Sequence, residues 1–260
     1  MKTLRLIWGY LRHNLMSGMA YRGAFLMQVF GMALNNLMLL FFWALVFEQF
    51  PEIKGWTLNN IIALYSVVAT GFGLAVVVFG NCVRVPRIIA SGDLDYYLTL
   101  PADPLIHVLV SRMSISGWGD LLFGLALYLI AVPDAWRTLP LFLLLSVLVG
   151  LIYVTFNVIA GSLAFWLGQA ENLASQLRMA LLNFSLYPVD IFPGGVRMLL
   201  YTLIPSAFVG SVPAKLVAQF DVIWLLRLVG MTVALAILAR VIFELGLRRY
   251  ESGNLVTVRG

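Results

Sequence analysis

The acidic residues of this chain form two groups that could do chemistry. Asp93 and Asp95 stand two residues apart in a polar stretch, and Asp120 lies in an apolar stretch beside small residues. Two carboxylates could share a divalent cation, but no further acidic cluster faces them. A charge in the middle of an apolar helix is costly, so Asp120 either lines a polar pathway or pairs with Arg112 or Arg227. We favour the ion pair.

Other catalytic and metal-binding patterns are missing from the sequence. The single cysteine, Cys82, and the two histidines, His13 and His107, cannot build a metal site without carboxylates nearby. The chain has no G-x-x-x-x-G-K-[ST] loop for nucleotide phosphates, no H-E-x-x-H and no G-x-S-x-G. We therefore expect no catalytic residue, no metal ion and no cofactor on this chain.

The composition is that of an integral membrane protein. Of 260 residues, 62% are hydrophobic and 11% are charged, with a mean hydropathy of +0.94, whereas soluble domains have about 25% charged residues. Such strong hydropathy indicates membrane-spanning helices and excludes a β-barrel. The net charge of +5 fits the basic bias of cytoplasmic loops rather than nucleic-acid binding.

Six apolar runs are long enough to cross a bilayer. The expected fold is therefore an all-α protein, a single transmembrane domain over residues 1–260, with spans at 23–47, 58–80, 105–132, 139–167, 172–192 and 222–247. With a cytoplasmic N-terminus, the loops and ends carry ten Lys and Arg residues inside and four outside. This count places both termini in the cytoplasm.

Three segments outside these spans have patterns of their own. Residues 1–22 combine apolar residues at helical spacing with basic ones, which predicts an amphipathic interfacial helix; the alternative is a basic flank of the first span. Residues 193–219 are apolar but rich in Pro and Gly, which predicts a re-entrant helical hairpin on the outer side. A Pro-kinked seventh span is the alternative there.

The third segment, 88–100, is predicted to be a short cytoplasmic helix. Pro86 ends the preceding helix, Ser91 or Asp93 can cap the new one, and Pro101 prevents its continuation.

The spacing of Leu94, Tyr97 and Leu98 gives that helix one apolar and aromatic face. This face could contact the membrane, the protein's own spans or a cytoplasmic subunit with a groove. An anionic membrane would repel Asp93 and Asp95, which favours the protein partner.

Polar residues within the spans have structural explanations. Arg240 and Glu244 have the i, i+4 spacing of an ion pair on one helix. Asn35 and Asn36 can hydrogen-bond between helices, and a substrate contact is the less favoured alternative.

Two stretches of sequence, together with this arrangement, resemble a known family. Residues 88–98 followed by Pro101 contain Gly92-x-Leu94-x-x-x-Leu98-x-x-Pro101, which resembles the Gly-x-Leu-x-x-x-Leu-x-x-Pro pattern of the permease subunits of ABC-2-type exporters. The ending 249–254, RYESGN, resembles the tail of a six-span branch of that class.

The resemblance implies a complex in the bacterial cytoplasmic membrane. Two permease chains, identical or homologous, would bind two cytoplasmic ABC ATP-binding subunits, which would hold ATP and Mg²⁺. The coupling residues would be Ser91, Gly92, Asp93, Leu94, Asp95, Tyr96, Tyr97 and Leu98. The translocation pathway and its gate would involve Asn35, Asn36, Asp120, Phe192 and Pro193.

Two other functions remain open on the sequence. The chain could be a membrane scaffold or assembly factor without an ATPase partner, or a lipid-modifying enzyme in which Asp120 and the Asp93–Asp95 pair act as catalysts. A neighbouring gene for an ATP-binding cassette would favour the exporter.

Overall fold

A computed structural model describes the fold of residues 2–250. This part of the chain is helical, apart from an isolated β-bridge between Ile53 and Trp56. The elements are α1 (Lys2–Met19), α2 (Arg22–Gln49), α3 (Leu58–Val78), η1 (Gly80–Arg84), α4 (Val85–Ala90), α5 (Leu94–Leu98), α6 (Pro104–Val110), α7 (Ser116–Ala131), α8 (Ala135–Ser162), α9 (Ala164–Leu167), α10 (Glu171–Ser185), η2 (Val189–Ile191), α11 (Gly194–Tyr201), α12 (Ser206–Val209), α13 (Ser211–Ala218) and α14 (Val222–Leu247).

The all-helical class is confirmed, but the count of six spans is not. Within the described residues, four helical stretches are long and apolar enough to cross a membrane: α2, α3, α8 with α9, and α14. A fifth is possible if residues 194–201 and 206–218, which are bent by 66°, count as one span. The expected helices 23–47, 58–80, 139–167 and 222–247 correspond to these four stretches within a few residues.

The helix expected over 105–132 is instead two helices, α6 and α7. Residues 111–115 leave the helix because their backbone bonds elsewhere: the Ser114 amide donates to the Val76 carbonyl of α3 at 2.9 Å. Gly80 permits this contact, since a Cβ there would lie 2.6 Å from the Arg112 carbonyl oxygen. A contact between residues distant in the sequence therefore divides this apolar run, which is continuous in the sequence, into two helices.

The helix expected over 172–192 ends early. α10 ends at Ser185, and Pro188 follows, which has no amide hydrogen and disfavours helix in the residue before it. Fifteen residues span about 22 Å, which is less than the roughly 30 Å of hydrocarbon. α10 is an amphipathic helix rather than a full span.

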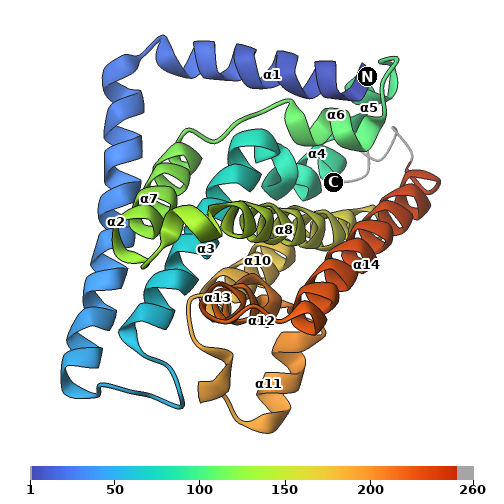
Figure 1. Cartoon of the computed structure of the whole chain (residues 1–260). Helices are drawn as coiled ribbons and strands as arrows, with labels where there is room; N and C mark the ends of the chain where they lie inside the picture. Colours follow the sequence, from blue (N-terminus) through green and yellow to red (C-terminus); the bar gives the residue numbers. More distant parts are fainter. Residues whose placement is uncertain (1, 251–260) are drawn as a thin grey trace.

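The Pro-rich segment is broken into two helical parts that are bent by 66°, a shape that fits a re-entrant hairpin and a kinked span alike. We call residues 194–218 the broken hairpin. α11 lies at one end of the molecule, while α12 and α13 turn back among the long helices (Figure 1). The side chains of α13 are largely buried against α3 and α8, including Val212, Ala214 and Leu216. Protein thus covers this irregular backbone, as a membrane requires.

The long helix α3 lies at the centre of the packing. In its most apolar stretch 72% of residues are buried, against 11% for α2 and 22% for α14. Glycines allow its neighbours to approach: a Cβ on Gly73 would lie 2.4 Å from the Leu121 amide nitrogen of α7, and one on Gly71 would lie 2.9 Å from the Ser146 carbonyl oxygen of α8. Small residues at helix contacts are the usual means of close packing in membranes.

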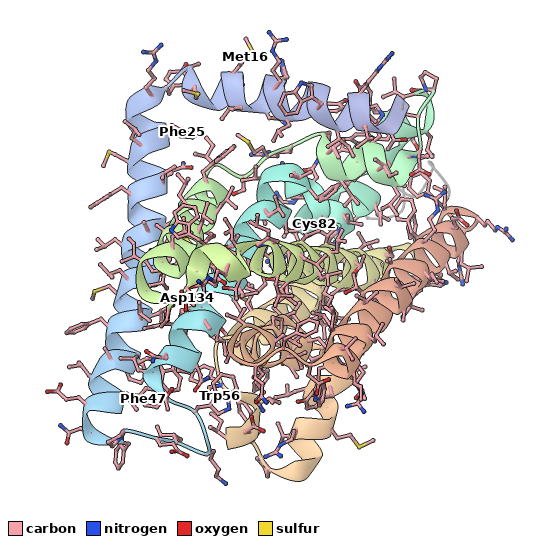
Figure 2. The ribbon with its side chains drawn as sticks, in the orientation of Figure 1. Met16, Phe25, Phe47, Trp56, Cys82 and Asp134 are labelled. Atoms are coloured by element: carbon pink, nitrogen blue, oxygen red, sulfur yellow. The ribbon has the colours of Figure 1, made fainter. Side chains whose placement is uncertain are left out.

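The helices α1 and α2 form an L along one edge of the molecule (Figure 1). α1 crosses the end where α5 and α6 lie, which we call the α1 end; α11 and the 50–57 loop lie at the opposite end, the α11 end. Tyr10 of α1 hydrogen-bonds His107 of α6. The side chains of α2 project outward along the free edge (Figure 2). Its exposed apolar residues include Met27, Phe30, Met38 and Phe41.

Replacing Gly73 with alanine should destabilise the fold, because the new methyl group meets backbone atoms that cannot move aside. We expect a loss of about 1–3 kcal/mol, measured as a lower apparent melting temperature in detergent. Gly31→Ala is the matched control, since nothing lies within 4 Å of its Cβ position. Equal melting temperatures for the two variants would contradict this packing.

Candidate functional site

The segment from α4 to α5, residues 85–98, contains all eight predicted coupling residues. It is two helices rather than one helix over 88–100: α4 ends at Ala90, and α5 begins at Leu94. Gly92 between them has φ +80°, which a residue with a Cβ rarely adopts. The break follows from this glycine turn.

The buried and exposed side chains of α5 differ from those that the helical spacing predicted. Leu94 is fully buried, and the Tyr97 hydroxyl lies 3.0 Å from Ser111 Oγ. Tyr96 and Leu98 are the exposed large residues, at 63% and 39%. The predicted face of Leu94, Tyr97 and Leu98 thus packs mostly against the protein's own helices, the alternative that we did not favour, and Tyr96 with Leu98 forms the accessible pair.

The polar residues of the turn bond one another. Ser91 Oγ lies 2.7 Å from Asp93 Oδ2 and 2.9 Å from the Arg87 carbonyl oxygen. Asp93 occupies the N-cap position of α5, but its side chain makes no capping hydrogen bond. Burial, and then the Asp95 carboxylate, raise the pKa of Tyr250 to about 12, so Tyr250 lies beside α5. Glu251 to Asn254, the rest of the tail pattern, lie outside the described residues.

Two ion pairs connect this end of the molecule to the later helices. Arg87 of α4 binds Glu171 of α10 with two hydrogen bonds, of 2.8 and 3.2 Å. Arg240 of α14 binds Asp103, which also caps α6 by accepting from the Ile106 amide at 3.0 Å. The expected Arg240–Glu244 pair is present as well. The two pairs therefore link the segments on either side of α5 to α10 and α14. The sequence pattern did not single out Asp103, Arg87 or Glu171.

Asp120 has a different partner from the one predicted. Asn36 Nδ2 of α2 donates to Asp120 Oδ1 of α7 at 2.7 Å, and both residues are buried. Among the described residues no ion pair joins Asp120 to Arg112 or Arg227; Arg227 lies over the Trp224 ring instead. Asn36 and Asp120 hold α2 against α7, whereas Asn35 is exposed.

A polar cluster stabilises the α11 end near the predicted gate residues Phe192 and Pro193. Asp190 Oδ2 accepts from Trp56 Nε1 at 2.8 Å and from Lys215 Nζ at 2.7 Å. Arg197 donates to the carbonyl oxygens of Asp190 and Phe192. Phe192 is half-buried and Pro193 is exposed. The cluster joins the loop before α3 to the broken hairpin, and neither Asp190 nor Trp56 belonged to the predicted site.

Comparison with known families identifies the family to which this chain belongs. The model of the ABC-2 family transporter proteins matches residues 33–253, which include the α4–α5 segment, the broken hairpin and α14. The protein belongs to this family and is a multi-pass membrane protein. No curated protein matches the sequence. Within residues 2–250 no three His, Cys, Asp or Glu side chains gather as metal ligands.

The Asp190 cluster should make stability depend on pH. Burial raises the pKa of Asp190, but the hydrogen bonds from Lys215 and Trp56, with the charges of Lys215 and Arg197, outweigh it and lower the pKa overall. The stabilisation is therefore full above about pH 4, the usual aspartate pKa, and is lost as the pH falls through the lower folded value.

We expect Asp190→Asn to lower the apparent melting temperature at pH 7 by a few degrees, equivalent to about 1–3 kcal/mol. The difference from the wild type should shrink below about pH 4. Asp134→Asn is the control, because the Asp134 side chain is 73% exposed. A difference that stays constant on acidification would contradict the role of the carboxylate charge.

Proposed function

We propose that this chain is the transmembrane permease subunit of an ATP-driven exporter, working as a pair of permease chains with two cytoplasmic ATP-binding subunits. Membership of the ABC-2 family supports a permease subunit. ATP and Mg²⁺ belong to the partner, which supplies the phosphate-binding loop that this sequence lacks.

The accessible Tyr96–Leu98 pair on α5 is the observation that carries the proposal. A short helix with an exposed aromatic and aliphatic pair suits a hydrophobic groove on a partner. The same segment is anchored to α10 through Arg87–Glu171, and the following residues to α14 through Asp103–Arg240. Closure of the ATPase at α5 would therefore reach α10 and the membrane-spanning helix α14.

The distribution of charge supports a cytoplasmic α1 end. Arg5, Arg12, Arg84 and Arg87 lie on α1, η1 and α4 at this end, whereas Lys54 and Arg197 lie at the α11 end. Basic residues favour the cytoplasmic side. α5 then faces the compartment that contains ATP.

The exposed edge of α2 is the surface on which we place the second permease and the translocation pathway. It carries Asn35 among its exposed apolar side chains. On the buried side of α2, the hydrogen bond between Asn36 and Asp120 holds this helix against α7. Phe192 and Pro193, directly before the broken hairpin, form the outer gate in this arrangement.

Removing the α5 pair should uncouple the subunits without unfolding the permease. The permease is co-expressed with a candidate ABC ATP-binding protein from the same genome, purified by a tag on the permease, and assayed for the bound subunit. For Tyr96→Ala with Leu98→Ala we expect about 10- to 100-fold weaker association, since two exposed anchors are removed.

Tyr21→Ala is the matched control, because Tyr21 is 78% exposed and lies between α1 and α2, away from α5. Undiminished recovery of the ATP-binding subunit with the double variant would show that α5 is not the docking helix. Failure of the wild-type chain to recover any ATP-binding subunit would favour the scaffold function instead.

A further inference from the structure

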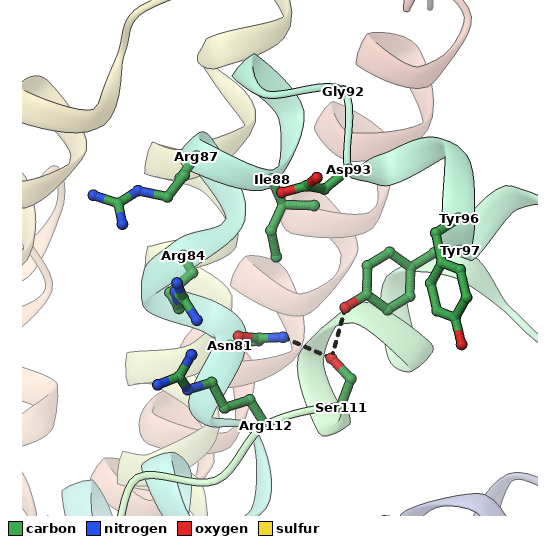
Figure 3. Close-up of a pocket in the computed structure, with 10 residues that line it drawn as sticks. All are labelled: Asn81, Arg84, Arg87, Ile88, Gly92, Asp93, Tyr96, Tyr97, Ser111 and Arg112. Atoms are coloured by element: carbon green, nitrogen blue, oxygen red, sulfur yellow. Dashed lines mark hydrogen bonds between the residues drawn. The ribbon is translucent and has the colours of Figure 1, made fainter.

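A polar cavity of about 720 Å³ lies at the α1 end, between η1, α4, α5 and the residues before α7 (Figure 3). Its lining includes three arginines, Arg84, Arg87 and Arg112, and one carboxylate, Asp93. Arg112 is distant in the sequence from Arg84 and Arg87, so the fold itself brings its charge beside theirs. No residue of the predicted pathway lines this cavity.

The positive charge of the cavity is only partly neutralised. Arg87 is bound to Glu171, at 2.8 Å. Neither Arg84 nor Arg112 takes part in an ion pair among residues 2–250. Figure 3 shows both of their guanidinium groups on the same side of Asn81. Like charges that share a cavity repel one another, and an anion between them would remove this cost.

Asn81 provides an independent indication of a ligand. It is 4% exposed, and its Nδ2 donates to Ser111 Oγ at 2.6 Å. Ser111 donates its own hydrogen to the Val108 carbonyl, so it can only accept from Asn81 and Tyr97. This fixes the amide with Oδ1 toward the arginines (Figure 3), where that atom is buried and has no hydrogen-bond partner.

An unsatisfied buried acceptor costs about 1–3 kcal/mol unless a donor arrives. The ligand should therefore combine negative charge for two guanidinium groups with a hydroxyl for Asn81 Oδ1. A phosphate group meets both needs, because guanidinium groups bind phosphate oxygens in pairs and a protonated phosphate oxygen, or a neighbouring hydroxyl, can donate. Sulfate meets only the first of these needs at neutral pH.

We propose that this cavity binds the phosphate group of an anionic ligand, held by Arg84 and Arg112 and oriented by Asn81. Tyr97 and Ser111 form part of the same wall, so an occupied site would stabilise the position of α5. The phosphate could belong to a phospholipid headgroup or to a soluble phosphorylated molecule. This site does not require that α5 docks on an ATPase.

The test uses the full-length chain in nanodiscs of phosphatidylcholine at 150 mM salt. Inorganic pyrophosphate is the soluble probe, followed by calorimetry and by the shift in melting temperature; phosphatidic acid added to the nanodisc is the lipid probe, followed by native mass spectrometry. Saturable binding of pyrophosphate alone identifies a soluble ligand, and selective retention of phosphatidic acid alone identifies a lipid headgroup.

Arg84→Gln with Arg112→Gln should weaken binding of the effective probe by about 100-fold, since two charge-assisted contacts are lost. Asn81→Asp keeps the side-chain size but places a carboxylate beside the guanidinium groups, and it should abolish binding. Arg5→Gln with Arg12→Gln is the control, because these arginines are exposed on α1 at the same end.

Melting temperatures without probe establish that each variant is folded. Unchanged affinity in either cavity variant, equal loss in the α1 control, or absence of saturable binding of both probes to the wild type would overturn the proposal. In the last case an acidic side chain of a partner protein would be the remaining occupant for Arg84 and Arg112.

Discussion

Close approach of helix backbones to α3 is the constraint on which the rest of this structure depends. Gly71 and Gly73 on α3 face α8 and α7 so tightly that an added Cβ would meet backbone atoms below 3 Å. In a bilayer, apolar burial does not drive helices together, so close packing must do so. With α7 and α8 fixed on α3, the broken hairpin has a protein surface to cover its irregular backbone, and residues 111–115 are held against the C-terminal end of α3.

At the α1 end, ion pairs join the segments around α5 to the later helices α10 and α14. The short helices at this end bury apolar residues such as Ile89, Leu94 and Val108 in the core. The ion pairs are partly exposed and individually weak, so burial contributes more than the pairs to the position of these helices. The polar cavity lined by Arg84 and Arg112 lies among these helices, and Tyr97 of α5 forms part of its lining.

Local patterns predicted much of the fold correctly. The bounds of α14 are those of the apolar run 222–247, and the break in the hairpin follows from its Pro and Gly residues. The Arg240–Glu244 pair also follows from spacing on one helix. Where the prediction failed, the cause was a contact distant in sequence: Ser114 bonding to Val76 ended a helix that hydropathy alone would continue, and Ser111 drew Tyr97 away from the surface.

The sequence by itself determined that this is a helical membrane protein, that its basic residues concentrate toward one side, and that it carries the ABC-2 family pattern around Gly92 and Leu98. These properties depend on composition and on spacing within one helix. Only the tertiary structure decided that Tyr96 and Leu98 are the accessible pair, that Asp120 binds Asn36, and that Arg84 and Arg112 share a cavity. Each of those results depends on side chains from separate helices, whose relative rotation is set by packing.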